Sequence, residues 1–323
     1  MSYNRKLHGY ASFVAFSTLF LIFVGGLVTS TDSGLSVPDW PLSYGRLFPP
    51  MVGGVFYEHG HRMVAATVGL LTIVLAVWLW KSEPRRWLRG LGLAALLAVV
   101  AQGTLGGITV LYHLPTPVSV AHAGLAQIFF CMTVSIAVFT SKDWLQDRVR
   151  RADGWRPSLR TLTALVAAAV YAQTLLGALM RHTRSGLAIP DFPLSFGRLL
   201  PPEFTRPVLI NFSHRCWALV VVSLVIWTGA RVLRTYREET SLQGPAAALL
   251  GGVLLQVLLG AETVWSGREV IPTTLHVACG AFILGASIVL ALRARLLFVP
   301  HPRVETAAAA QTGVPGSWAG SAR

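Results

Sequence analysis

The chain has 323 residues, of which 53% are hydrophobic and 13% are charged, and its formal net charge at pH 7 is +13. Ordinary soluble domains carry about 25% charged residues, so the composition excludes that class and indicates a membrane protein. The basic residues are not interleaved with base-stacking aromatic residues, and we therefore predict no nucleic-acid partner.

A helix needs about 20 residues to cross a hydrocarbon core about 30 Å thick. Eight apolar stretches reach this length, at residues 10–31, 58–80, 88–110, 118–140, 159–181, 207–230, 245–265 and 272–297. Because each half has an even number of crossings, the second half starts on the same side of the membrane as the first. We predict an all-α membrane protein whose eight transmembrane helices form two tandem four-helix bundles in a pseudo-twofold relation.

This organisation divides the chain into four parts. Residues 1–145 are expected to form the N-terminal bundle, 146–158 a cytoplasmic linker, 159–298 the C-terminal bundle and 299–323 a tail. The tail is small and polar without periodicity, so we expect it to be disordered.

Lysine and arginine accumulate in the cytoplasmic segments of membrane proteins. Nineteen of the 27 such residues lie at the N-terminus, in the 81–89 and 231–237 turns, in the 142–160 segment or towards the C-terminus, and six lie on the opposite side. Both termini are therefore predicted to be cytoplasmic. Neither a cleaved signal nor a transit peptide stands out, and a multi-pass protein of a bacterial plasma membrane is expected.

Two outer loops repeat one sequence. Ser33–Pro50 and Ser185–Pro202 are identical at thirteen of eighteen positions, at an offset of 152 residues. Their prolines restrict the backbone and their aromatic residues favour the membrane interface. We expect stiff loops that act either as lids over two sites or as purely structural turns, each with an internal ion pair, Asp39 with Arg46 in the first loop.

Each loop leads into a helix with a histidine near its start, and a second histidine follows in each half, giving His61, His122, His214 and His276. All four are predicted at one membrane depth near the outer surface. A single one is readily explained as an interfacial residue, but four at matched positions indicate metal or haem ligation. Haem iron fits best because two imidazoles from two helices can bind its opposite faces, whereas zinc takes more ligands.

Charged residues next to these histidines differ between the halves. Arg62 and Arg215 directly follow a histidine and can reach a haem propionate, unless they only snorkel to the interface. Glu58 lies on the same helical face as His61, and Asn211 takes its place in the second half. Since only the carboxylate can move a proton, we predict a reactive first site and an accessory second site. A structural carboxylate at a helix start is the alternative.

Three short matches place a glutamine four residues before a glycine, at Gln102–Gly106, Gln173–Gly177 and Gln256–Gly260. On a helix this spacing puts both residues on one face. Small residues there let a second helix or a flat ligand approach closely.

With these residues identified, the sequence resembles the haem A synthase family, which makes haem A from haem O during cytochrome oxidase assembly. The resemblance covers about residues 8–298. It rests on Glu-x-x-His-Arg at Glu58, His61 and Arg62, on the duplicated loops PDWPLSYG and PDFPLSFG, and on the motifs AHAGLAQ, NFSHR and TLHVACG around the other three histidines.

The resemblance implies that His214 and His276 ligate a resident haem b, that His61 and His122 frame the substrate haem O, and that Glu58 is the acidic residue needed for activity. It implies an oxidoreductase that converts a porphyrin methyl group to a formyl group by successive hydroxylations and loss of water. Haem O synthase, an electron-transfer protein and membrane lipid are the implied partners.

The sequence departs from the family pattern in its cysteines. Some members carry a cysteine pair in the first outer loop, whereas Cys131, Cys216 and Cys279 all lie in apolar segments here. A redox relay through loop thiols is therefore excluded.

Two alternative functions fit less well. A di-haem b membrane cytochrome would place its haems at two depths, and a parallel-repeat transporter would have broken helices near the midplane. The oligomeric state, including a homo-oligomer, and the source of the oxygen stay open.

Overall fold

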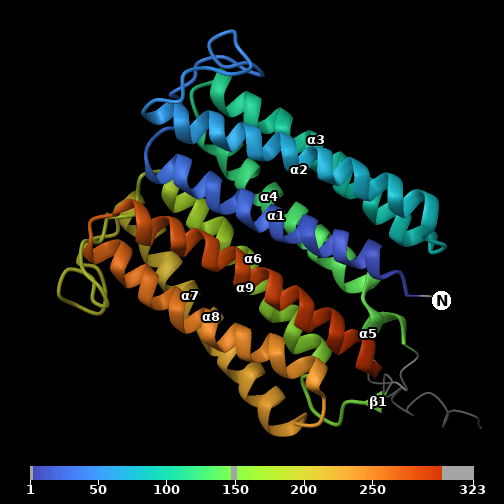
Figure 1. Cartoon of the computed structure of the whole chain (residues 1–323). Helices are drawn as coiled ribbons and strands as arrows, with labels where there is room; N and C mark the ends of the chain where they lie inside the picture. The colour runs from blue at the N-terminus through green and yellow to red at the C-terminus, as the bar shows by residue number, and fades with distance from the viewer. Residues whose placement is uncertain (1–2, 147–150, 300–323) are drawn as a thin grey trace, which may run out of the picture.

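The computed structural model describes residues 3–146 and 151–299. Eight helices in these ranges are long and apolar enough to cross a membrane, namely α1 (Arg5–Ser30), α2 (Gly54–Ser82), α3 (Arg86–Leu111), α4 (Thr116–Thr140), α6 (Leu159–His182), α7 (Arg206–Thr235), α8 (Thr240–Trp265) and α9 (Val270–Leu297) (Figure 1). The prediction of an all-α, multi-pass membrane protein is confirmed.

Local sequence explains several helix starts. The side chain of Asn4 accepts a hydrogen bond from the Leu7 N–H at the start of α1, and Ser158 caps α6 in the same way. Prolines occupy the first turns of α4 and α7, where a backbone N–H would have no helical partner. Pro245 lies inside α8, so this helix begins one turn earlier than hydropathy predicted.

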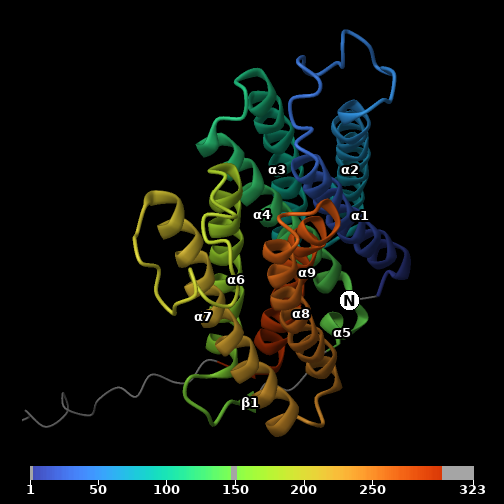
Figure 2. The same cartoon turned by 90° about the vertical axis from the view of Figure 1, so that its left-hand side faces the viewer.

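The helices pack in two rings of four (Figures 1 and 2). In the first, α2 and α4 lie diagonally, each packed on α1 and α3; in the second, α7 and α9 lie diagonally, each packed on α6 and α8. One apolar cluster draws only on α1–α4 and another lies in α6–α9, closed by Phe298. Because lipid tails are as apolar as leucine, these clusters stabilise the rings by close packing. The domain boundaries and the pseudo-twofold relation stay predictions.

Hydrogen bonds join the outer ends of the two rings. Arg181 at the end of α6 donates to the Gly26 carbonyl and to Ser30 Oγ of α1, at 3.2 and 2.8 Å. Thr274 of α9 donates to the same Ser30 oxygen at 2.9 Å. These contacts link helices far apart in sequence, and the rings therefore meet along α1, α4, α6 and α9.

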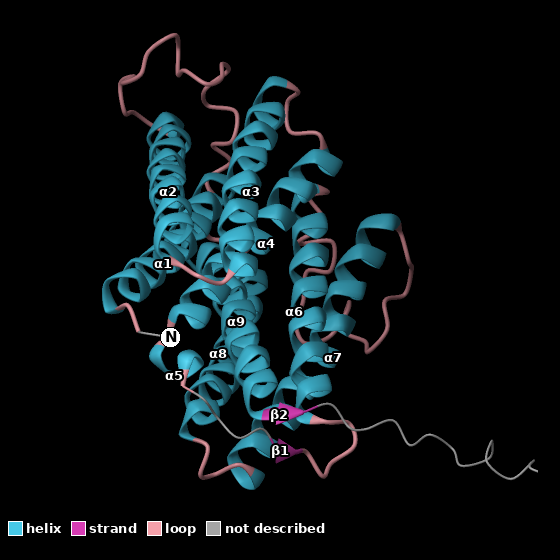
Figure 3. Ribbon diagram, turned by 90° about the vertical axis from the view of Figure 1, so that its right-hand side faces the viewer, coloured by secondary structure: helices cyan, strands magenta, loops and turns pink. Residues whose placement is uncertain are grey.

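At the opposite end lie short elements that hydropathy did not predict. They are the one-turn helix α5 (Lys142–Leu145) and strand β1 (Arg151–Ala152), which pairs in parallel with β2 (Phe298–Val299) at the end of α9 (Figure 3). The predicted disordered tail lies outside the described residues except for Val299.

Asp153 anchors the linker to the second ring. Its carboxylate accepts hydrogen bonds from Arg231 at 2.8 Å and from the Tyr236 hydroxyl at 2.7 Å, and it also caps Leu159. Burial favours a neutral Asp153, but these donors outweigh it and hold its pKa below the usual value. Burial and the bond to Asp153 raise the pKa of Tyr236 to about 12. Asp153 thus ties the described part of the linker to α7 and to the start of α6.

Candidate functional site

Each outer loop is closed by a turn around one aspartate. The two carboxylate oxygens of Asp39 accept hydrogen bonds from the backbone N–H groups of Gly45 and Tyr44, both at 2.7 Å. Asp191 does the same in the second loop. The Gly45 N–H, followed by that of Tyr44, holds the pKa of Asp39 below its usual value. The predicted ion pair with Arg46 is wrong for the described residues, because the turn already surrounds this carboxylate with N–H donors.

An arginine fastens each loop to the helix that follows it. Arg62 of α2 donates to the carbonyls of Asp39 and Leu42, at 2.8 and 2.7 Å, and Arg215 of α7 donates to those of Asp191 and Leu194, at 2.7 and 2.9 Å. A third bond goes from each arginine to the carbonyls of Val37 and Ile189, respectively. Both guanidinium groups are therefore loop anchors in this structure, which is more than snorkelling. Their binding to a haem propionate stays a prediction.

Glu58 and Asn211 occupy equivalent positions in the two halves, but Glu58 accepts a hydrogen bond from its loop whereas Asn211 donates hydrogen bonds to its loop. Glu58 is 4% exposed; it accepts a hydrogen bond from the Val37 N–H at 2.8 Å and forms an ion pair with Arg62 at 2.6 Å. Asn211 is 2% exposed, and its Nδ2 donates to the carbonyls of Ser185 and Gly186 at 2.9 Å. Glu58 also lies beyond the first turn of α2. A simple helix-start carboxylate therefore does not describe it.

The four predicted histidines lie about two turns inside the outer ends of α2, α4, α7 and α9. His61 and His122 lie on the diagonal helices α2 and α4 of the first ring, and His214 and His276 lie on the diagonal helices α7 and α9 of the second. The structure thus places each of the two predicted pairs within one ring. His59, by contrast, is buried and hydrogen-bonded to Ser43 of the loop, which is a structural role.

A glycine of the preceding helix touches each of the four imidazole rings. A Cβ added at the glycine would lie only 3.0–3.3 Å from the ring Cε1 in the pairs Gly25–His61, Gly106–His122, Gly177–His214 and Gly260–His276. Any larger residue would push the ring away. The glutamine–glycine pattern had indicated three of these glycines as positions for the close approach of a helix or a flat ligand, but not their contacts with the histidines. The repeat offset that aligns Gly25 with Gly177 could have found the fourth.

Glutamines hold three of the four histidines. Gln102 donates to the His122 carbonyl at 2.8 Å, and Gln173 donates to the His214 carbonyl at 3.0 Å. The Gln256 amide lies 3.2 Å from Nε2 of His276. Leu21 occupies the matching position on α1, so His61 has no such neighbour there.

The histidine pairs fit a haem by two criteria. The Nδ1 atoms of His61, His122 and His276 are buried without a hydrogen-bond partner in the part of the chain that the structure describes. Such atoms are costly unless a ligand or a partner satisfies the ring. No group of three or more His, Cys, Asp or Glu that could hold a metal ion occurs among the described residues. Two imidazoles per site suit the two axial positions of haem iron.

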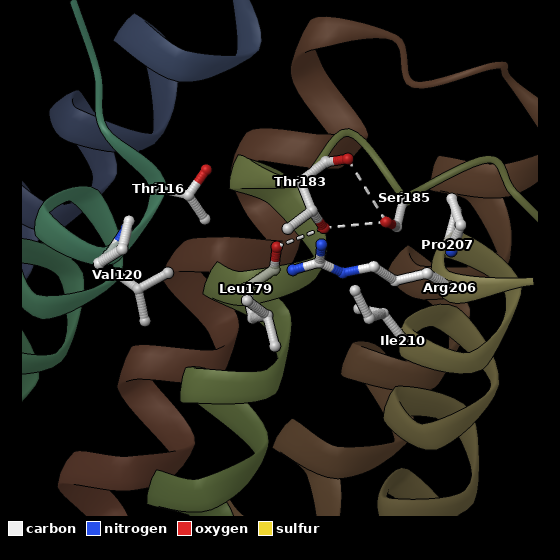
Figure 4. A pocket seen from close by; sticks show the side chains of 9 residues that line it. Thr116, Val120, Leu179, Thr183, Ser185, Arg206, Pro207 and Ile210 are labelled. Atoms are coloured by element: carbon white, nitrogen blue, oxygen red, sulfur yellow. Dashed lines mark hydrogen bonds between the residues drawn. The ribbon is translucent and has the colours of Figure 1, made fainter.

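A separate cavity of about 570 Å³ opens at the outer ends of α4, α6 and α7 (Figure 4). Its wall includes Val120, Leu179 and Ile210, and Thr183 and Arg206 also line it. None of the four histidines lines it. We therefore do not assign it to the candidate haem sites.

Comparisons with known proteins identify a family and several similar proteins. The model of one family, described as "Cytochrome oxidase assembly protein" (COX15-CtaA), matches residues 9–53 and 52–289. A protein named "Heme A synthase" from Symbiobacterium thermophilum is 33% identical over 251 residues, which cover 75% of this chain and 80% of that protein. A protein of the same name from Geobacillus kaustophilus is 27% identical over 302 residues, covering 90% and 93%.

Proposed function

The chain belongs to the COX15-CtaA family of cytochrome oxidase assembly proteins, and from this premise we propose that it makes haem A from haem O. Relatives named "Heme A synthase" match up to 90% of the chain, which supports the proposal. The reaction is the oxidation of a porphyrin methyl group to a formyl group. Each of two hydroxylations removes two electrons from that carbon and adds one oxygen atom, and loss of water leaves the formyl group.

The first ring is the proposed substrate site. His61 and His122 would hold the iron of haem O from α2 and α4. Glu58 lies one turn further out than His61 on α2, between the loop N–H of Val37 and the guanidinium of Arg62. There it would hold or pass on a proton, or stabilise positive charge that develops at the ring edge. The Glu58 and Asn211 difference, at otherwise matched sites, is the observation that carries this assignment.

The second ring is the proposed site of a resident haem b, with His214 and His276 as its axial ligands. A haem held by two imidazoles supplies one-electron transfer. Asn211 would have a structural role here, because its amide fastens the loop through the carbonyls of Ser185 and Gly186. A di-haem cytochrome without synthase activity is disfavoured, since it would have no use for a buried carboxylate in one site alone.

The eight apolar helices support a setting in a membrane. We propose a bacterial plasma membrane, with both termini cytoplasmic and both repeated loops outside. The two rings would correspond to domains 1–145 and 159–298, joined by the cytoplasmic linker. Haem O synthase would deliver the substrate, and a separate redox protein would exchange electrons with the second site. Reporter fusions at the loops and the N-terminus would test the orientation.

The variant Glu58→Gln tests the function. The amide keeps the size of the side chain but cannot ionise, so conversion of haem O to haem A should fall by about 10²-fold or more. Haem extracted from the purified variant and identified by mass would measure this. Asn211→Gln is the control in the second site, because it keeps an uncharged amide, and it should retain most of the conversion. A normal rate for Glu58→Gln would contradict the assignment.

A further inference from the structure

The two proposed haem sites differ at a second position, which lies on the helices that precede the histidines. Three of these helices carry the glutamine–glycine pair, and each glycine touches the ring of a histidine. The repeat offset of 152 aligns Gln173 with Leu21 and Gly177 with Gly25. The glycine is thus present in all four helices, whereas the glutamine is missing only next to His61.

Each glutamine has an atom free to orient a ring. The Nε2 atoms of Gln102 and Gln173 donate to the backbone carbonyls of their histidines, and those of Gln173 and Gln256 lie 3.2 Å from a ring nitrogen. The Oε1 atom of all three is buried without a hydrogen-bond partner among the described residues. A histidine that binds a metal through one nitrogen normally donates its other ring N–H to an oxygen acceptor, which fixes the ring and strengthens the bond. The free Oε1 atoms are suitable acceptors.

Leu21 can offer no such acceptor. Its side chain branches one carbon earlier than that of glutamine and carries no polar atom. Nothing at this position can therefore orient the His61 ring once its other nitrogen binds iron. Loss of an orienting partner typically lowers metal affinity by 10–100-fold.

We propose that Leu21 makes His61 the releasable ligand, so that the first site exchanges its haem, while Gln173 and Gln256 lock both ligands of the second site and retain its haem. This inference rests on the proposed function, which requires a substrate to enter the first site and a product to leave it. Gln102 would keep His122 in place during the exchange. The glutamines are positioning residues that act through the histidines.

Haem exchange tests the proposal without any assay of conversion. Purified full-length protein loaded with haem b is mixed with excess apomyoglobin, and haem transfer is followed by absorbance. Backgrounds carrying His61→Ala or His214→Ala leave one complete site each, so the two rates are separable. When these backgrounds carry no further substitution, we expect the first site to lose haem at least tenfold faster than the second.

Two reciprocal variants sharpen the test. Leu21→Gln should slow haem loss from the first site about tenfold or more, and Leu21→Met is the control because it fills the space without an amide. Gln173→Leu should speed loss from the second site by about 10–100-fold. Gln173→Glu, which keeps an acceptor oxygen, should restore retention. If Gln173→Leu does not fold, Gln256→Leu tests the same site.

The outcomes separate this inference from the proposed function. Equal exchange at both sites, no effect of either reciprocal variant, or no haem bound at all would overturn the inference. Unequal exchange in a protein that never converts haem O would leave the inference standing and refute the function. Conversion of haem O together with equal haem exchange at both sites would refute the inference and leave the proposed function standing.

Discussion

The two halves hold their outer loops by the same bonds but face their proposed haem sites with different groups. In both, an arginine after the first histidine binds three loop carbonyls, and an aspartate binds two loop N–H groups. The halves diverge at Glu58 against Asn211 and at Leu21 against Gln173. The shared residues are those that build the fold, and the divergent ones lie beside the histidines. The repeated residues therefore account for the shared architecture, and the positions at which the two halves differ are the candidates for the chemistry.

Exchanging Glu58 and Asn211 between the two halves should have the largest effect on conversion. In the double variant Glu58→Asn with Asn211→Glu, conversion of haem O should fall by about 10²-fold or more and should not recover. The carboxylate would then lie in the site that we propose retains its haem, where substrate does not enter. Product analysis by mass measures this. Recovery of conversion in the double variant, relative to Glu58→Asn alone, would show that the halves are interchangeable.

The sequence predicted the fold well because hydropathy alone decides which segments cross a membrane. The repeat also predicted two histidines at matched positions in each half, and both histidines of each half lie on the diagonal helices of one ring. It did not predict the partners of Asp39 and Arg62, because these are backbone groups and every residue has them. The Gly25 contact escaped for a related reason. Its helix lacks the glutamine that made the other three glycines recognisable.

The next effect concerns the loop anchors. Arg62→Met should lower the free energy of unfolding by about 3–5 kcal/mol, because it leaves the buried Glu58 carboxylate without its ion-pair partner. Arg215→Met should cost less, about 1.5–3 kcal/mol, because Asn211 is uncharged and only bonds to carbonyls are lost. Reversible unfolding in detergent measures both values. Equal losses would mean that the Glu58 ion pair adds no stability.

The smallest expected effect concerns the stability of the two loop turns in acid, and it should be the same in both halves. Backbone N–H groups, first those of Gly45 and Gly197, lower the carboxyl pKa of Asp39 and Asp191, respectively. A lowered pKa stabilises the folded turn at every pH above the ordinary carboxyl value of about 3.9. That contribution is lost as the pH falls through the lowered value, and raising the pH above neutrality should change nothing.

Hydrogen exchange at the Gly45 and Gly197 amides measures how often the two loop turns open. Protection corrected for the intrinsic rate should hold at pH 5 to 8 and decline only in acid, equally in the two loops. Asp39→Asn should weaken protection at neutral pH and remove its acid dependence in the first loop alone. A decline near neutral pH would assign the transition to another group. Unequal declines would mean that the difference between the halves extends into the loops, whereas matched ones would confine it to the residues beside the histidines.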